Sequence, residues 1–373
     1  SGAVSIPFPD EEAGVSFEQV AGVDVIQNFG SPEREYEAAV SGAAVRFRGP
    51  RAQWRFEGRQ PVEMLSGVVT GVMPPPLEAG ELGVLAGRAT YHTVLTPKGK
   101  IVADLRLWRD DEGDAVRLRA DLSHAAAPGL AELLQRTLPP RLARRVDLGD
   151  DMGMLTVLGP DASRLLSGTV LGLRVDRADL DELQEGELRM LAEPGADRLL
   201  VIRNGDLSVP AFDVVGDRDV LRSAWRSLVG GGAVRVGRDT WDTLRVEAGR
   251  PDFVGELAHE VIPVEAGIHD RAIDYDKGCY TGQEVIVRIR DRGRVNRMLR
   301  RLRLEIDAPL PDIGTEVYRE GERPMGSLTS VADSPREGKL ALAYVRREVE
   351  PGQTVKTGDL IARGDVLADG PST

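Results

Sequence analysis

The sequence contains a single cysteine, and this scarcity excludes several kinds of protein. One cysteine cannot form an intramolecular disulfide, and zinc sites built from cysteine pairs are impossible. Chains without disulfides are typical of reducing compartments, which favours a cytoplasmic location. The sequence also lacks the run of about 18 apolar residues that a membrane helix requires. Its first residues, Ser1-Gly2-Ala3, do not resemble a signal peptide, so no membrane partner is expected.

Positive charge is scarce as well. Lys and Arg number 48 against 60 Asp and Glu, which gives a net charge of −12. Broad binding to nucleic acid needs a positive field, so nucleic acid is not an expected partner. Aromatic residues make up only 5% of the chain, whereas 42 Gly and 23 Pro indicate many turns. A chain of 373 residues exceeds one ordinary core, so two or three domains are expected.

Two parts of the sequence repeat one another in an ungapped register, which indicates an internal duplication. Each copy has the pattern of a strand, a turn and a short amphipathic helix. The matching stretches are 54–58 with 155–159, 65–67 with 166–168, and Gly71 with Gly172. We infer two similar α/β modules.

The remaining pattern predicts the order of the elements. Helices are expected at 32–41, 125–138 and 219–229. Strands are expected at 91–95 and 101–107, joined by a hairpin at 96–100, and at 198–203 and 211–215. Further short strands follow at 300–306, 316–319, 326–331, 340–346 and 360–363. The spacing of this last group is typical of a small all-β barrel.

We therefore expect an α+β fold in which two duplicated α/β modules are followed by a C-terminal β-barrel domain. The boundaries we assign are an N-terminal arm at 1–36, a first α/β module at 37–145, a second α/β module at 146–290 and the barrel at 291–373. The second module ends in the segment that carries the only cysteine.

That cysteine lies in residues 277–284, KGCYTGQE in one-letter code, which we call the cysteine segment. Lys277, two residues before Cys279, would favour the thiolate through its positive charge. Gly278 and Gly282 permit tight turns and the close approach of a ligand. This pattern favours Cys279 and Lys277 as catalytic residues, and whether the thiol is a nucleophile, a redox group or a transient iron ligand stays open. The alternative is a small buried cysteine in a turn.

Two carboxylates stand in surroundings where burial has to be compensated. Asp104 lies inside an apolar strand, where it would face a pocket and polarise a substrate amine; the alternative is a strand residue facing solvent. Glu247 precedes Ala248 and Gly249 at the end of a helical pattern, where a carboxylate can accept from the N–H groups of a heterocycle. Capping and packing are the alternative for Glu247.

Arginines crowd the stretch that follows the cysteine segment. They are Arg288, Arg290, Arg292, Arg294, Arg297, Arg300, Arg301 and Arg303. Alternation over 285–290 predicts a strand with Val285, Val287 and Ile289 on one face and Arg288 on the other. Because guanidinium groups match carboxylates, one interpretation is an anion site that includes Arg288. The alternative is a solvated strand with salt bridges on an acidic protein.

The cysteine segment, the hairpin at 96–100 and the two pieces ending in Glu-Ala-Gly, 244–249 and 262–267, follow an order that resembles the GcvT superfamily. This family includes the glycine-cleavage T-protein, an aminomethyltransferase, and the YgfZ-type tetrahydrofolate-binding proteins. The segment KGCYTGQE of this chain resembles the signature of the YgfZ-type proteins. The resemblance covers nearly the whole chain. It implies a three-domain cloverleaf around a central hole that holds tetrahydrofolate as cofactor, with 37–145 as the folate-binding module.

The same resemblance implies roles for individual residues. Asp104 matches one of two adjacent aspartates of T-proteins, one of which is catalytic, and is expected to be catalytic here. Asp213 matches the acidic residue on the pterin. Tyr91 and Glu247 are expected at the folate site, with Arg288 at the glutamate tail. No metal ligand is implied.

The sequence departs from the T-protein pattern in ways that disfavour aminomethyl transfer. Of the aspartate pair after the hairpin only Asp104 remains, and neither Trp241 nor Asp242 supplies the arginine expected near the folate. The YgfZ resemblance implies instead an accessory factor in iron–sulfur cluster assembly or repair that uses Cys279. Its partners would be iron–sulfur assembly proteins or cluster-containing enzymes. The alternatives are a folate-dependent aminomethyltransferase or related methyltransferase, and an interaction module without a folate pocket.

Overall fold

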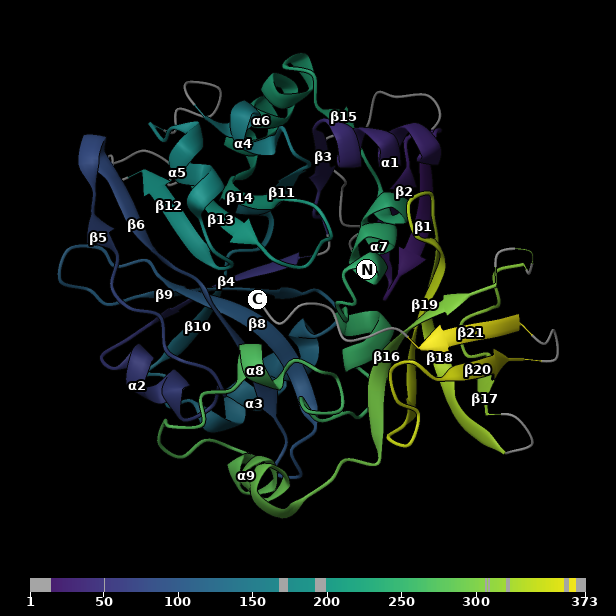
Figure 1. Cartoon of the computed structure of the whole chain (residues 1–373). Coiled ribbons are helices and arrows are strands. Elements are labelled where there is room, and N and C mark those ends of the chain that lie inside the picture. Colours follow the sequence, from purple (N-terminus) through teal and green to yellow (C-terminus); the bar gives the residue numbers. More distant parts are fainter. Residues whose placement is uncertain are drawn as a thin grey trace.

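The computed structural model describes residues 15–366 apart from 50, 168–173, 192–198, 306, 308, 320–322 and 359–361. Two sheets with their helices and a β-barrel form three lobes around a common centre (Figure 1). This arrangement confirms the expected α+β class and the C-terminal barrel. Among the described residues, no helix is both long enough and apolar enough to cross a membrane.

One lobe is built on a five-stranded antiparallel sheet. In spatial order its strands are β10 (Arg144–Asp147), β4 (Arg51–Glu57), β9 (Leu118–Ser123), β8 (Ile101–Arg109) and β7 (Thr90–Leu95). Helices α2 (Pro61–Ser66) and α3 (Ala127–Thr137) contribute Leu65, Leu130 and Leu134 to its core. Burial alternates along β8, so Ala103 and Leu105 enter this core while Asp104 and Arg106 lie on the opposite face.

The second lobe is built on an eight-stranded sheet. In spatial order its strands are β15 (Val234–Arg235), β3 (Ala44–Phe47), β11 (Met152–Leu158), β14 (Ala211–Asp217), β13 (Leu200–Asn204), β12 (Glu187–Leu191), β6 (Val84–Arg88) and β5 (Glu78–Ala79). The helices of this lobe are α4 (Ala162–Leu166), α5 (Arg177–Glu182) and α6 (Arg218–Gly230). As expected, α6 stops at its glycine run; it begins at Asp217, whose carboxylate accepts from the Asp219 amide at 2.8 Å.

The internal duplication is confirmed. Strand β11 and helix α4 repeat β4 and α2 in the register expected from the sequence. The repeat extends to the sheets, because the order β4-β9-β8-β7 in one corresponds to β11-β14-β13-β12 in the other. Gly168 and Gly172, which belong to the second copy, lie outside the described residues.

The two sheets are also interlocked. Strands β3, β5 and β6 precede residue 145 in the chain, yet all three belong to the eight-stranded sheet. Strand β3 pairs with β11, and β6 pairs with β12. The eight-stranded sheet therefore crosses the boundary assigned at residues 145 and 146, and the four-part division of the chain stays a prediction.

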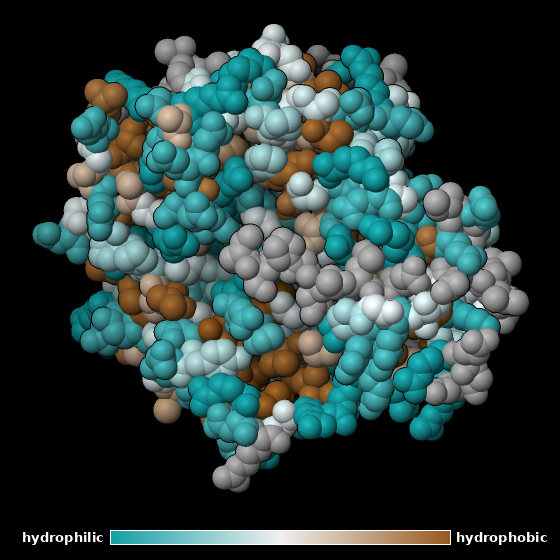
Figure 2. Space-filling view, viewed as in Figure 1, coloured by the Kyte–Doolittle hydropathy of each residue, from teal (hydrophilic) through white to brown (hydrophobic). Residues whose placement is uncertain are grey.

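The third lobe is a closed barrel. Its strands follow the order β16 (Arg297–Leu304), β19 (Gly338–Arg346), β18 (Pro324–Ser334), β17 (Glu316–Tyr318), β20 (Thr354–Thr357) and β21 (Ala362–Val366), and β21 pairs back with β16. Residue 360, where the last predicted strand began, lies outside the described residues. The face in Figure 2 is mostly hydrophilic, with an apolar area between α8 and β16, which agrees with 29% charged residues.

The N-terminal arm contains a hairpin of β1 (Ser16–Val20) and β2 (Val23–Asn28), followed by α1 (Pro32–Ser41) where a helix was predicted. Helices α7 (Arg238–Glu247) and α8 (His269–Ala272) lie near the centre. Short 3-10 turns occur at Glu81–Gly83 and Gly149–Asp151, and a π-helical turn at Phe253–Leu257.

The strand predicted over residues 285–290 is wrong, because this stretch belongs to helix α9 (Gln283–Arg292). Ile286 is fully buried on the inner face of α9, whereas Arg288 and Glu284 lie on the exposed face. These two charged residues are four positions apart and form an ion pair, as neighbours on one helical face do. Helical packing thus overrides the alternating β-branched pattern.

Candidate functional site

The centre of the molecule holds a pair formed by Asp104 and Tyr91 on neighbouring strands. The Tyr91 hydroxyl donates to Asp104 Oδ2 at 3.0 Å. The other carboxyl oxygen, Oδ1, is buried and has no hydrogen-bond partner in the described part of the chain. Burial raises the pKa of Asp104, since a charged carboxylate is disfavoured away from water. One oxygen is therefore held by Tyr91 while the other stays available as an acceptor.

Tyr91 is itself held from the other side. The guanidinium of Arg271, on α8, lies 4.7 Å from the centre of the Tyr91 ring. Arg271 pairs with Glu185, from Nε at 2.9 Å, and with Asp206 at 3.0 Å. Although burial opposes it, the positive charge of Arg271 holds the pKa of Asp206 down to about 2. The pair thus borders a region of alternating fixed charges.

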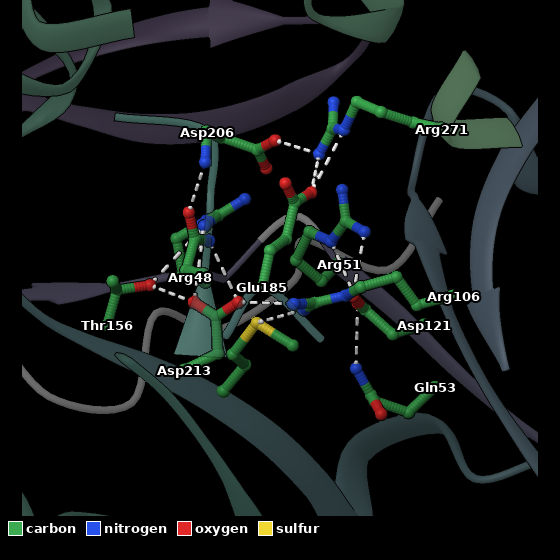
Figure 3. Close-up of polar contacts among 12 residues, drawn as sticks. Arg48, Arg51, Gln53, Arg106, Asp121, Thr156, Glu185, Asp206, Asp213 and Arg271 are labelled. Carbon is green, nitrogen blue, oxygen red and sulfur yellow. Dashed lines mark hydrogen bonds and ion pairs between the residues drawn. The ribbon is translucent and has the colours of Figure 1, made fainter. Parts of the chain in front are cut away.

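Asp213 lies on β14 of the facing sheet and is fully buried. Its carboxylate accepts from Thr156 Oγ1 at 2.6 Å, Arg106 Nη1 at 2.7 Å and Asn204 Nδ2 at 2.9 Å (Figure 3). Arg48 lies at 3.7 Å from the same group. All of these partners belong to the protein, so Asp213 acts here as an internal tie between the two sheets.

Arg106 links this tie to a second buried carboxylate, Asp121 on β9. Arg106 donates to Asp121 from Nη2 at 2.7 Å, and Arg51 donates to it from Nε at 2.8 Å and Nη2 at 2.9 Å. Gln53 completes the set at 3.1 Å (Figure 3). Despite burial, the two guanidinium groups hold the pKa of Asp121 well below its usual range. The carboxylates of Asp121, Asp206 and Asp213 are thus paired with arginines, whereas Asp104 has no such hydrogen-bonded arginine among the described residues.

Glu247, the expected folate ligand at the end of α7, is enclosed elsewhere. It accepts from Tyr36, Ser208, Ser334 and Arg336, each at 2.5 Å. These hydrogen bonds lower its pKa against the opposing effect of burial. Because the partners come from α1, a loop and the barrel, this geometry favours the packing alternative for Glu247.

The cysteine segment leads from α8 into α9 and exposes Cys279. The ammonium of Lys277 donates to the carbonyls of Val69 at 2.8 Å and Gly71 at 3.1 Å. Burial lowers the pKa of Lys277 to about 8. The Gly71 amide in turn donates to Nδ1 of the fully buried His92 at 3.1 Å. Lys277 therefore ties the segment to the five-stranded lobe.

The structure brings two of the sequence motifs into contact. A Cβ at Gly282 would lie 2.7 Å from the carbonyl oxygen of Thr96, and one at Gly99 would lie 3.0 Å from Val285 Cγ1. The cysteine segment and the start of α9 thus pack directly on the hairpin at 96–100. Gly282 adopts a φ of 83°, a conformation that favours glycine.

Arg288 does not join the central residues. Its side chain is 69% exposed on the outer face of α9, where it pairs with Glu284. The described site therefore combines Asp104 and Tyr91, and Asp213 lies on the other sheet and binds Arg106, a neighbour of Asp104 on the same face of β8. Glu247, Arg288 and Cys279 occupy other places.

Sequence reasoning missed most of the surrounding charges. These are Arg48, Arg51, Arg106, Asp121, Glu185, Asp206 and Arg271. A signal was present for two of them, because Arg106 and Asp121 are charged residues inside otherwise apolar strands, as Asp104 is. Their further partners, Asp213 for Arg106 and Arg51 for Asp121, could not be identified, since these pairs join strands that lie far apart in the sequence.

Comparison with known proteins gives a consistent result. The family model described as the GCVT N-terminal domain matches residues 10–277. A protein named aminomethyltransferase from Rubrobacter xylanophilus is 32% identical over 273 residues, covering 71% of this chain and 68% of that protein. Another protein named aminomethyltransferase, from Saccharopolyspora erythraea, is 26% identical over 353 residues, covering 93% of this chain and 90% of that protein.

A solved structure shares the fold. It is the crystal structure of the glycine cleavage system aminomethyltransferase T from Bartonella henselae, with a TM-score of 0.80. The match covers 95% of this chain and 94% of that one at 20% sequence identity. The arrangement of two interlocked sheets and a barrel is therefore that of a known three-lobed architecture.

Proposed function

The chain belongs to the GcvT family, as the match to its GCVT N-terminal domain and the similarity to an aminomethyltransferase establish, and on this premise we propose that it binds tetrahydrofolate and transfers a one-carbon group. The transfer would take place at Asp104. The alternative weighed from the sequence, folate-dependent aminomethyl or methyl transfer, thereby becomes the leading proposal.

The observation that carries the proposal is the free oxygen of Asp104. Oδ1 is buried and has no hydrogen bond within the residues that the structure describes, and a polar atom in that state costs stability until a donor reaches it. An N–H group of a folate or of an amine substrate is such a donor. Tetrahydrofolate fits the chemistry of this position, where Tyr91 and Asp104 would hold it.

Asp213 fits a folate less well than the sequence implied. Its hydrogen bonds from Arg106, Thr156 and Asn204 occupy both carboxylate oxygens. Contact with a pterin would require one of these donors to move. We therefore assign the ligand to Asp104 and Tyr91, and give Asp213 the role of positioning Arg106.

When bound, tetrahydrofolate supplies the reduced ring nitrogens that carry the one-carbon unit. Asp104 would accept a hydrogen bond at Oδ1, and burial, which raises its pKa, favours a proton on this carboxyl group, as general acid–base catalysis requires. Tyr91 keeps the carboxyl in one orientation through its 3.0 Å hydrogen bond. Arg271 restrains Tyr91 in turn by lying over its ring.

A titration of tetrahydrofolate by calorimetry tests the proposal, with Asp104→Asn compared with the wild type. Asn offers an amide in place of the acceptor pair, so we expect binding at least about tenfold weaker. Asp114→Asn, at an exposed turn position, is the matched control and should bind as the wild type does. Equal affinity of all three proteins, or no binding to any, would refute the proposal.

The reaction is tested separately from binding. We expect formation of 5,10-methylene-tetrahydrofolate from an aminomethyl-lipoyl carrier, or loss of a methyl group from a small methylated amine, and neither in Asp104→Asn. If the protein binds folate tightly but turns over none of these donors, the result would indicate a folate-binding protein that is not a transferase. No folate binding at all would favour the interaction module.

A second candidate function is favoured by the exposure of Cys279. An accessible thiol on a segment that Lys277 anchors is placed to meet a partner protein, as an accessory factor in iron–sulfur cluster assembly would require. This role would belong to a reducing compartment such as the cytoplasm. Cys279→Ser should then keep folate binding but lose the ability to rescue a cluster-enzyme defect; full rescue by that variant would contradict it.

A further inference from the structure

A pocket opens beside the central residues, between α7, the tip of the β1–β2 hairpin and the end of β9. Its empty space is about 530 Å³, a volume that includes the open mouth. Four arginines line it: Arg46, Arg48, Arg51 and Arg238. The other polar lining residues are Ser123, His124 and two carboxylates, Asp242 and Asp252.

Most of these arginines have carboxylate partners. Arg51 is bound by Asp121 through two hydrogen bonds. Arg238 pairs with Asp242 at 2.8 Å and with Asp252 at 3.5 Å. Arg48 lies 3.7 Å from Asp213. The positive charge of three of the four is thus already compensated by the protein.

Arg46 is the exception. Its side chain extends from β3, and the residue is only 7% exposed. Within the described residues its guanidinium forms no hydrogen bond and no close ion pair, and the centre of the Trp241 ring lies 4.7 Å from the guanidinium carbon. The carboxylates of Asp242 and Asp252 attract it from a greater distance. A buried guanidinium whose N–H groups lack an acceptor is unfavourable, so an acceptor that reached Arg46 from the pocket would stabilise it.

Trp241 brings a second cation to the same place. The guanidinium of Arg48 lies 3.9 Å from the centre of the Trp241 ring. Two guanidinium groups on one indole repel each other, and burial together with the charge of Arg48 lowers the pKa of Arg46. An anion between or beside them would relieve both the repulsion and the desolvation.

We propose that this pocket binds an oxyanion, a carboxylate or phosphate group of a small molecule, through the guanidinium groups of Arg46 and Arg48 held on Trp241. Guanidinium forks match both kinds of oxyanion, and the indole keeps the two side chains in place. This site depends on Arg46 and is expected whether or not the protein binds folate. It thus goes beyond the function proposed above.

Calorimetric titration with inorganic phosphate, against chloride at matched ionic strength, tests the site. We expect the wild type to bind phosphate and Arg46→Met to bind at least about tenfold more weakly. Arg34→Met, on the exposed face of α1, is the matched control and should bind as the wild type does. Absence of phosphate binding in the wild type, or equal binding by Arg46→Met, would overturn the proposal.

Thermal unfolding adds a readout that a merely structural role would not give. Because the buried Arg46 has no hydrogen bond or close ion pair in the described part of the chain, Arg46→Met should be about as stable as the wild type without anion and should gain nothing from phosphate. If Arg46→Met does not fold, Arg46→Lys decides. It keeps the charge but loses the fork, so it should respond to phosphate more weakly than the wild type; a response equal to the wild type's would overturn the assignment.

Competition identifies the source of the anionic group. If folate carries it, phosphate should weaken tetrahydrofolate binding in the wild type and have no such effect in Arg46→Met. If the group belongs to a separate small molecule, phosphate and tetrahydrofolate should bind together. Both results support the oxyanion site, and they assign it to different ligands. Phosphate that weakens folate binding equally in both proteins would contradict it.

Discussion

Arg106 on β8 reaches Asp213 on β14 with its Nη1 2.7 Å from the carboxylate, and this pair joins the two copies of the duplicated module. The same guanidinium also donates to Asp121 on its own sheet. One arginine therefore compensates two buried carboxylates that belong to different lobes. Replacing it leaves both with fewer donors, which makes it the residue on which the central packing depends most.

Arg106→Met should lower the free energy of unfolding by about 3 kcal/mol or more, since breaking a buried ion pair leaves an uncompensated charge. Urea unfolding monitored by circular dichroism measures this. Arg136→Met removes the exposed pair with Glu132 on α3 and should cost no more than about 0.5 kcal/mol. Similar losses in the two variants would show that the central pair carries no special weight.

Gly282→Ala should destabilise the protein, because Gly282 has a φ of 83° and its Cβ would lie 2.7 Å from the Thr96 carbonyl. The backbone conformation alone costs an L-residue about 1–2 kcal/mol. Gly278→Ala, in the same segment, is the matched control, since nothing lies within 4 Å of its Cβ. Chemical unfolding compares the two, and a Gly278 variant as unstable as the Gly282 variant would rule out this explanation.

The free energy of unfolding should fall as the pH is lowered, in part because of His92. Burial lowers the pKa of His92 from 6.5 to about 3, so the folded protein keeps it neutral while the unfolded chain takes up a proton below pH 6.5. Its contribution is full above pH 6.5 and declines toward pH 3, with a slope of up to about 1.4 kcal/mol per pH unit. His92→Gln should show a flatter decline than His259→Gln, an exposed control. Parallel curves in urea unfolding between pH 7 and pH 4 would contradict this.

Lys277 should make the stability of the protein depend on pH in the alkaline range. Burial lowers its pKa from 10.5 to about 8, so between these pH values the unfolded chain holds a proton that the folded protein has released. Stability therefore rises with pH through this range. Lys277→Met should lack that rise, whereas Lys98→Met, at an exposed position of the hairpin, should retain it. Thermal unfolding from pH 7.5 to 10 measures the difference, and an unchanged rise in Lys277→Met would be evidence against it.

The sequence predicted what depends on local order. The hairpin at 96–100, the helix at 32–41 and the duplicated strand–helix unit follow from turn residues and periodicity, and the structure has all three. Asp104 could be singled out because a lone charge in an apolar strand demands an explanation. Its neighbour Arg106 gives the same signal, but its partner Asp213 belongs to the other copy, and no local pattern connects them.

Helix α9 shows where local reasoning misleads. Val285, Val287 and Ile289 alternate as in a strand, and β-branched residues favour that state. In the structure Gly282 opens the helix with a left-handed turn, and Val285 packs on Gly99 of the hairpin. A contact between segments far apart in the sequence thus decided the conformation. The anion pocket escaped notice for the same reason, since Arg46 and Trp241 come from opposite ends of the module pair.

The interlocking of the sheets governs the order in which the chain can mature. During synthesis β3 is made about a hundred residues before β11, the strand with which it pairs. In the same way β6 is made before its partner β12. Until then both present unpaired edges, which are prone to association with other chains. A cut at residue 145 would therefore separate strands of one sheet from their partners. A nascent chain that ended there would expose unpaired strand edges, to which chaperones could bind.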